Sequence, residues 1–347
     1  MDARATYSDS GKPRTAHPEG SSASPLIRPC PVCRSTSTDI WLTIPHGSLD
    51  LGDSDWVLVR CAECDLLYSA NLPAAGLTQV YLDDPFYSRI FHDSQRSTNR
   101  LNFESILSPS HVEMCLNAVG AVPRGRVLEI GCGSGSLLIS LSKLGWSPEG
   151  VELSREIEEA LAPFGIPVHV GQFEAINLEG RKFELIVMFD VIEHTLDPVL
   201  FLSKAFRLLT PGGRILLSTP NFEGIRARVE GPYWTGVHAP FHIVLFNRQS
   251  LRLVIERAGG RVIREREVST LAATALGFIG ATLRFMSRSN SGERISRSGM
   301  AGLPVTKSKW IPLAILAGLF VGPLEFLLER ITRRQDAIYF VAEKRCE

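Results

Sequence analysis

A short glycine-rich stretch, residues 131–136, carries the clearest chemistry in this sequence of 347 residues. It follows the apolar, strand-like run 126–130 and precedes a helical pattern, an order that places a nucleotide at the carboxyl edge of a doubly wound sheet. Gly131 and Gly133 leave room for a ligand against the backbone, and the following helix offers free N–H groups. The third glycine stands one residue earlier than in the dinucleotide fingerprint, which makes a pyrophosphate cradle a poorer interpretation.

Acidic and polar residues near this stretch favour a ligand that is cationic at one end and carries a nucleoside at the other. Glu129 lies two residues before the first glycine, where a carboxylate would repel a pyrophosphate and attract an ammonium group. Glu152 ends the next strand pattern, at the usual distance for a carboxylate that accepts both ribose hydroxyls. Gln172 and Phe173 follow the third strand pattern, placed to meet the edge and face of an adenine, and Asp190 ends the fourth.

Four cysteines occur as two C-x-x-C pairs, the spacing of a tetrahedral metal site. They are Cys30, Cys33, Cys61 and Cys64. Such a site uses all four ligand positions, so we expect a structural Zn²⁺ rather than a catalytic one. A thioredoxin-like redox role does not fit, because neither pair precedes a helix in a βαβ context. Free thiols and an N-terminus without a secretory signal predict a cytoplasmic protein.

Three histidines beyond the fourth and fifth strand patterns are candidates for a general base. Neutral imidazole near pH 7 is the natural proton acceptor, so we select His194, His238 and His242 as catalytic candidates. The last two lie in the aromatic stretch 231–247, which we interpret as a lid over an acceptor. Each histidine also has a structural interpretation: packing or helix capping for His238 and His242, and ordering of the cofactor loop for His194.

The elements that must position these residues follow from the alternation of strand and helix patterns between residues 125 and 268. This alternation predicts an α/β fold with a parallel sheet covered on both faces, and the near-continuous apolar runs 185–189 and 215–217 indicate central strands. The predicted organisation is a disordered leader 1–25, a zinc-ribbon module 26–73, a helical linker 74–120, a core 121–270, a hydrophobic helical insert 271–334 and a last core strand within 335–347.

Taken in order, these motifs resemble those of the class I S-adenosylmethionine-dependent methyltransferases. They are E-x-G-x-G-x-G from Glu129, then Glu152, the Gln172–Phe173 pair, FDVIEH and LLTPGGRILLSTPN. The resemblance covers about residues 121–268 and the final strand. It implies a doubly wound, seven-stranded Rossmann-like sheet, with Glu129 and the glycines at the methionine end of S-adenosylmethionine, Glu152 at the ribose and Gln172 at the adenine amine. The full set of expected cofactor-binding residues is Glu129, Gly131, Gly133, Gly135, Glu152, Gln172, Phe173 and Asp190.

The block W-x-G…P-x-H…F within 234–246 is similar to that of the ubiquinone-biosynthesis-like, type 23-like methyltransferases, which act in lipid, quinone or surface-sugar pathways. The N-terminal ribbon with this core also resembles zinc-ribbon methyltransferases, including nucleotide-sugar C-methyltransferases. A sulfonium already carries an activated methyl group, so such an enzyme mainly aligns the acceptor and excludes water. We therefore expect methyl transfer to a hydroxyl or carbon of a small or lipid-linked molecule, such as a sugar or a quinone.

Two other classes of function fit parts of the sequence. One is a methyltransferase or binding module for RNA or protein, with the ribbon as the recognition element, and the other is a nicotinamide oxidoreductase. Nucleic acid is disfavoured as a partner because 37 Lys and Arg balance 37 Asp and Glu. In addition, the place of the D/N-P-P-Y/F motif of amino-methylating DNA enzymes reads DVIEH. The oligomeric state and the methylated atom stay open.

The predicted insert 271–334 contains two long uncharged runs, 271–283 and 311–324, around a basic segment. The second run is short for a membrane span and contains Pro312 and Pro323, so we do not expect it to cross a bilayer. One interpretation is a hairpin that rests on anionic headgroups at the inner face of the membrane. The other is a pair of helices packed on the domain or in a dimer contact.

Overall fold

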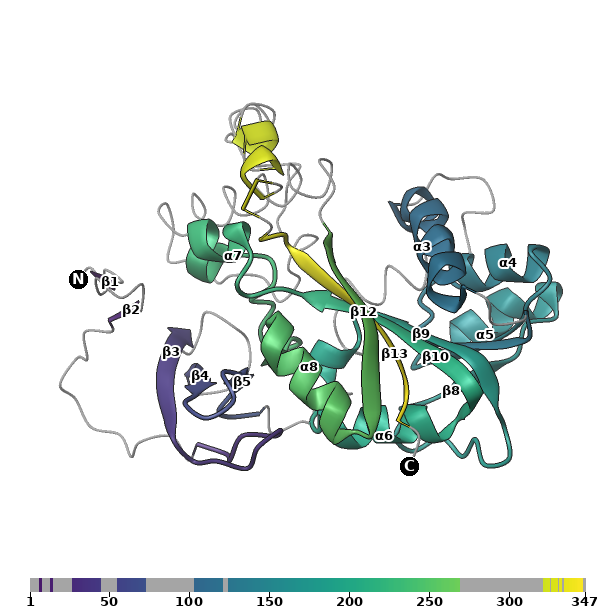
Figure 1. The fold of residues 1–347 in the computed structure, drawn as a ribbon, viewed down its shortest axis with the longest axis horizontal. Coiled ribbons are helices and arrows are strands. Elements are labelled where there is room, and N and C mark those ends of the chain that lie inside the picture. The colour runs from purple at the N-terminus through teal and green to yellow at the C-terminus, as the bar shows by residue number, and fades with distance from the viewer. Residues whose placement is uncertain are drawn as a thin grey trace.

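The computed structural model of the protein describes residues 27–44, 55–72, 103–120, 124–268 and 321–345, apart from positions 325, 330 and 333, together with the pairs 6–7 and 13–14. A seven-stranded sheet forms its centre (Figure 1). Its strands are β6 (Arg126–Ile130), β7 (Ser147–Glu152), β8 (Val168–Val170), β9 (Phe183–Phe189), β10 (Leu209–Pro220), β12 (Gly260–Val268) and β13 (Ala337–Lys344).

The strand order is β12-β13-β10-β9-β6-β7-β8. Strands β6 to β10 are parallel, whereas β13 runs antiparallel to both β10 and β12. This confirms the predicted doubly wound α/β fold and its seven strands. The carboxyl ends of the parallel strands meet at one edge, which is where this kind of sheet binds its ligands.

Alternate side chains of the central strands face two different layers of helices. Leu185 and Val187 of β9 pack with α3 (Phe103–Val119) and α4 (Ser136–Lys143), whereas Ile186 and Met188 pack with α6 (Pro198–Arg207) and α8 (Arg248–Arg257). The near-continuous apolar sequence of β9 is therefore explained by burial on both faces. Helix α3 comes from the predicted linker 74–120, of which residues 74–102 lie outside the described residues.

The predicted ribbon module contains the strands β3 (Thr38–Ile44) and β4 (Trp56–Cys61). They continue into β5 (Leu67–Ser69), and the fourth strand of this sheet, β11 (Val244–Leu245), comes from the predicted lid. Buried residues of the ribbon and of the α/β core belong to one hydrophobic cluster. The ribbon thus shares the hydrophobic core of the α/β domain and does not form a core of its own.

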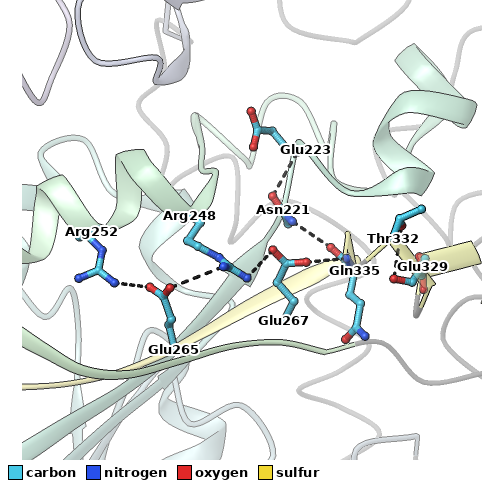
Figure 2. A network of polar contacts seen from close by, with 9 residues as sticks. All are labelled: Asn221, Glu223, Arg248, Arg252, Glu265, Glu267, Glu329, Thr332 and Gln335. Carbon is cyan, nitrogen blue, oxygen red and sulfur yellow. Dashed lines mark hydrogen bonds and ion pairs between the residues drawn. The ribbon is translucent and has the colours of Figure 1, made fainter.

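A polar network ties together the places where the chain leaves and re-enters the main sheet (Figure 2). Glu267, near the end of β12, accepts hydrogen bonds from Arg248 at 2.8 Å and from the backbone N–H of Gln335 at 2.9 Å. The carbonyl of Gln335 accepts one from Asn221, just beyond β10, at 3.0 Å. Both ends of the chain between β12 and β13 are therefore held beside the end of β10.

Much of the predicted leader and insert lies outside the described residues. Of the leader 1–25, only Thr6–Tyr7 and Pro13–Arg14 are described, as an antiparallel pair. Of the insert 271–334, the described part is residues 321–332, which are helical apart from the gaps at 325 and 330, followed by Arg334. Within the described ranges, no helix combines the length and the apolar character needed to cross a membrane.

Arg226, in α7 (Ile225–Glu230), lies at the centre of a buried ion cluster at the start of β13. Its side chain is 2% exposed, its Nε donates to Glu230 at 2.9 Å, and its Nη1 pairs with Asp336. Asp336 also accepts a hydrogen bond from Trp234 Nε1 at 3.0 Å. The cluster fastens the segment that follows β10 to the beginning of β13.

We expect Arg226→Leu to lower the free energy of unfolding by about 3–5 kcal/mol, because two acidic groups would lose the guanidinium that offsets their charge. Chemical denaturation followed by circular dichroism measures this change. The control is Arg228→Leu, an exposed arginine in the same helix, whose effect should stay within about 0.5 kcal/mol. Equal losses from the two substitutions would contradict the central place of Arg226.

Candidate active site

The glycine-rich stretch forms the turn between β6 and α4 at the carboxyl edge of the sheet. Gly131, Gly133 and Gly135 have φ angles of +71°, +49° and +72°, a region that side-chain-bearing residues rarely adopt. A Cβ on Gly131 would lie 2.7 Å from Val191 Cγ2. The turn therefore requires glycine for its own conformation as well as for the approach of a ligand.

Glu152 ends β7 directly beside this turn. The backbone N–H of Gly133 donates to its Oε2 at 2.9 Å, and the N–H of Leu153 donates to its Oε1 at 2.6 Å. The residue is 8% exposed, so its carboxylate is both buried and held from two sides. A carboxylate held in this way at the end of the second strand is of the type that accepts the hydroxyls of a ribose.

Helix α3 forms one wall of the site. It covers Glu129 of β6, which is 6% exposed: burial and, secondarily, the charge of Glu129 raise the pKa of the Cys115 thiol in α3. His111 of α3 stacks on Phe189 at the end of β9, with ring centroids 4.3 Å apart and planes 18° apart. His111 could not be predicted from the sequence, because no local pattern shows which strand a preceding helix will cover.

Gln172 and Phe173, which follow β8, have different surroundings in the structure. Gln172 is exposed at this edge strand, where sequence analysis places the adenine. Phe173 is 3% exposed and packs edge-on against Phe201 of α6, with ring centroids 4.9 Å apart, while Lys204 Nζ lies 4.9 Å from its ring centroid. The ring of Phe173 belongs to the hydrophobic core, and the expected contact with an adenine face does not fit this geometry.

Asp190 ends β9 in the left-handed conformation, with φ of +53°. Its N–H donates to the carbonyl of Ser218 at 3.1 Å, and its Oδ1 accepts from Ser218 Oγ at 3.2 Å. Burial raises the pKa of this carboxyl, and burial and the charge of Asp190 raise the pKa of Tyr339 on β13. Asp190 is exposed at the ligand-binding edge, and an acid in an uncommon backbone conformation at such an edge is typical of a functional position.

His194, His238 and His242 come together beyond the ends of β9 and β10. The ring centroids of His194 and His242 lie 4.7 Å apart, and those of His238 and His242 lie 5.2 Å apart. Nδ1 of His194 pairs with the carbonyl of Phe241, and Nδ1 of His242 with that of Gly236, each at 2.9 Å. Burial lowers the pKa of His194 to about 4, and burial and the two neighbouring histidines lower that of His242. Both rings are therefore neutral at pH 7.

Glu193, which sequence analysis did not select, lies fully buried beside these histidines. Thr219 Oγ1 donates to its Oε2 at 2.9 Å, and no described residue forms a hydrogen bond with its Oε1. Burial and the charge of Asp190 raise its pKa, which favours the protonated form. Its ligand atoms and those of His194 and His242 lie within 4.8 Å of one another. The sequence signal that could have identified Glu193 is its position directly before His194.

The predicted thiol cluster is assembled by the ribbon. It consists of Cys30, Cys33, Cys61 and Cys64, whose sulfur atoms lie within 4.8 Å of one another. The two sulfur pairs that cross between the knuckles are 3.6 and 3.4 Å apart. A tetrahedron with Zn–S bonds of about 2.3 Å requires sulfur separations of about 3.8 Å, so the four thiols are compatible with Zn²⁺. The knuckles share one geometry, since Arg34 and Asp65, the residues after each pair, have φ of +65° and +61°.

Comparison with known proteins bears on the α/β core. Residues 110–265 match a family model described as a methyltransferase domain. The ubiquinone biosynthesis O-methyltransferase of Parvibaculum lavamentivorans is 30% identical over 35% of this chain and 51% of its own length. That of Chelativorans sp. is 35% identical over 28% of this chain and 40% of its own length. The chain thus spans about half or less of the length of these relatives.

Among solved structures, phosphoethanolamine N-methyltransferase 2 of Haemonchus contortus in complex with S-adenosyl-L-methionine aligns with 84% of this chain and 64% of its own. Its identity is 17% and its TM-score 0.47, a likeness too remote to add to the assignment. The region matched by the family model contains the glycine turn, Glu152 and all three histidines. These findings do not support the oxidoreductase alternative. Residues 110–265 form a domain of the class I, S-adenosylmethionine-dependent methyltransferases.

Proposed function

We propose that the protein transfers the methyl group of S-adenosylmethionine to an oxygen atom of a small or lipid-linked acceptor. The observation that carries this proposal is the buried carboxylate of Glu152, held against the amide of Gly133 at the carboxyl ends of β6 and β7 in a methyltransferase domain. The relatives are named for O-methylation in ubiquinone biosynthesis. Their names favour a hydroxyl of a quinone-type molecule over a carbon nucleophile or a sugar.

The residues that would hold the cofactor follow the ends of three neighbouring strands. Glu129 and the turn 131–135 would bind the methionine end, Glu152 the ribose and Gln172 the adenine edge. When bound, the cofactor supplies a methyl group already activated by the sulfonium charge. Buried carboxylates suit a cationic sulfur compound, because attraction between opposite charges is stronger away from water.

We assign different roles to the three histidines. The ring of His194 is held by the backbone carbonyls of Phe241 and Asp190, which suits an anchor for the lid. His242 donates its Nδ1–H to the carbonyl of Gly236, so its Nε2 would be free to accept the hydroxyl proton of the acceptor. His238 packs beside His242 and is likewise half-buried, which makes it the second candidate for this proton transfer.

The proposed reaction is tested by incubating the protein with methyl-labelled cofactor and two sets of acceptors: quinone-precursor phenols and a fractionated lipid extract. We expect a product that carries the label and is heavier by one methylene group, with fragmentation placing the methyl on oxygen. Label on carbon would overturn the choice of a hydroxyl acceptor. Absence of cofactor binding would overturn the enzymatic assignment of the whole chain.

We also infer that the four-cysteine site binds one Zn²⁺ in a structural role. The donor set is four thiols, and all four ligand positions of a tetrahedral ion would be occupied by protein. Such an ion would bind no acceptor. It would stabilise a ribbon whose own strands are short.

Glu152→Ala should weaken cofactor binding at least about a hundredfold, because two charge-assisted hydrogen bonds to the ribose would be lost at about 1.5–3 kcal/mol each. Calorimetric titration with S-adenosylmethionine and its demethylated product measures the change. The control is Glu159→Ala, an exposed acid in the next helix, which should bind as the unsubstituted protein does. Zinc content should be the same in both variants. Unchanged affinity in Glu152→Ala would contradict the assignment of this carboxylate.

The neutral His194 should make stability depend on pH. Its folded pKa of about 4 lies below its unfolded value of about 6.5, so between these values only the unfolded chain takes up the proton. Above pH 6.5 this histidine should not change the free energy of unfolding. Between pH 6.5 and pH 4 it should lower that free energy by about 1.4 kcal/mol for each unit by which the pH falls. His194→Gln keeps a donor for the Phe241 carbonyl and should remove this part of the slope. Urea unfolding of both proteins at pH 7 and pH 5 measures the difference, and identical slopes would contradict it.

We propose a membrane surface as a further partner, because the helical stretch 321–332 exposes a stripe of apolar side chains. Its members recur at spacings of three or four residues and are 37–69% exposed: Val321, Leu324, Leu327, Leu328 and Ile331. Figure 1 shows this stretch, in yellow, next to the beginning of β13. The segment 284–309 of the sequence carries six basic residues and one acid, which suits anionic headgroups. A lipid-linked acceptor would then reach the nearby end of β10 from the bilayer surface.

Leu327→Glu combined with Ile331→Glu should lower binding to vesicles of phosphatidylcholine and phosphatidylglycerol about tenfold or more, since each buried apolar side chain contributes about 1.5–3 kcal/mol. Co-sedimentation measures the bound fraction. Leu200→Glu, at a position on α6 that is 66% exposed, is the matched control and should bind normally. Failure of the unsubstituted protein to sediment with the vesicles would contradict the proposal.

A further inference from the structure

We propose that the four-cysteine ribbon positions the histidine segment of the methyltransferase site, so that metal binding in the ribbon and placement of the histidines are coupled. The histidine segment is defined as residues 236–247, which contain His238 and His242. The catalytic meaning of the coupling rests on the proposed function. The coupling itself depends only on the contacts described below.

The histidine segment is part of the ribbon's sheet. Its strand β11 pairs antiparallel with β5, with Val244 opposite Tyr68 and Leu245 opposite Leu67. All four of these residues are completely buried. The second knuckle leads directly into β5, so the edge on which the segment is built begins at the metal site.

Ile243 joins the ribbon to the loop after β9. Its carbonyl accepts a hydrogen bond from the N–H of Ser69 in β5 at 2.9 Å, and its own N–H donates to the carbonyl of Glu193 at 3.0 Å. His242 directly precedes Ile243, and His194 directly follows Glu193. A shift of β5 would therefore move the backbone that carries both rings.

Helix α8, which follows the histidine segment, is bound by the two knuckles at its opposite ends. Asn247, the N-cap of α8, donates from Nδ2 to Asp65 Oδ2 at 2.9 Å, directly after the second cysteine pair. Arg257, the last residue of α8, donates to the carbonyl of Val32 between the cysteines of the first pair at 2.6 Å. Figure 1 shows α8 lying between the ribbon strands and the main sheet. The helix thus spans the distance between the knuckles.

These contacts require closed knuckles. Asp65 reaches Asn247 from a left-handed backbone conformation, and Arg60 Nη2 pairs with the same Oδ2 at 2.7 Å. The binding of a metal by four thiols is a large contribution to the stability of a small ribbon, because the site does not exist in the unfolded chain. Loss of the metal should therefore release β5, and with it β11 and the start of α8.

The glycine turn packs partly apart from the ribbon, although Ile130 and Val151 at the ends of β6 and β7 share the ribbon's hydrophobic cluster. Cys132, Leu138 and Ile157, which pack around the glycine turn, belong to a separate hydrophobic cluster without any ribbon residue. The turn is bonded to its own neighbours, as in the hydrogen bond from Gly131 N–H to the Val151 carbonyl at 2.9 Å. Loss of the metal should thus disturb the placement of the histidines and leave cofactor binding nearly unchanged.

The test compares the full-length zinc-bound protein with the same protein after removal of the metal by a chelator, with zinc quantified in both. Hydrogen exchange with mass spectrometry should show amide exchange in residues 236–247 accelerated by about tenfold or more, with residues 126–152 unchanged within about twofold. The affinity for S-adenosylmethionine should stay within about threefold. This readout needs no acceptor, so it stands even where methyl transfer to every tested compound fails.

A substitution at the second knuckle tests the coupling without removing metal. Asn247→Ser keeps a side-chain oxygen as the N-cap of α8 but is too short to reach Asp65. It should accelerate exchange in the histidine segment about fivefold, the effect of one lost hydrogen bond, and lower kcat without changing KM for the cofactor. Zinc content should stay at one per chain. The matched control is Gln249→Ser, an exposed position two residues after Asn247. It should change neither the amide exchange of the histidine segment nor kcat.

Three results would overturn the proposal. One is unchanged exchange of residues 236–247 after the zinc has been removed. Another is faster exchange throughout the core together with loss of cofactor binding, because the ribbon would then support the whole domain and not this segment. The third is a purified protein that contains no zinc and gains none when the metal is added.

Discussion

The hydrogen bond from Gly133 to Glu152 joins the two neighbouring strands on which the proposed cofactor site depends. Strands β6 and β7 are parallel and in register, with Ile130 opposite Val151, so the turn after one strand meets the last residue of the other. Gly133 donates to this carboxylate from a backbone with positive φ, a conformation that glycine adopts readily. The sheet itself thus prepares this half of the site, and no distant part of the chain is needed.

The proposed acceptor side of the site is built in a different way. Its residues come from a helix before the sheet, from loops after β9 and β10, and from β13 near the end of the described chain. His111 and Tyr339 both lie against Phe189, and His194 lies against His242, only because these distant elements pack together. One half is therefore local and stiff, whereas the other depends on long-range contacts. Such a division allows acceptor specificity to change while the binding of a shared cofactor is kept.

Local patterns were sufficient to predict the strands, the glycine turn, the position of Glu152 and the grouping of four cysteines, because each depends on residues close in sequence. They were insufficient for Phe173. A residue just after a strand can turn toward the edge or toward the core, and its packing against Phe201 decides the matter. The insertion of β11 into the ribbon was also beyond prediction, since two residues of strand carry no signal of their partner. Glu193 was missed because its burial results from the same long-range packing.

The register of β12 and β13 places Val268 opposite Ala337. The sixty-eight positions from 269 to 336 therefore depart from and return to a single rung of one antiparallel ladder, which Glu267 and Gln335 reinforce. Because the entropy of closing a loop grows only with the logarithm of its length, this rung would tolerate a much shorter or longer excursion at little cost. Evolution could thus replace the chain between these points with a segment of another length, while the order of the strands stays the same.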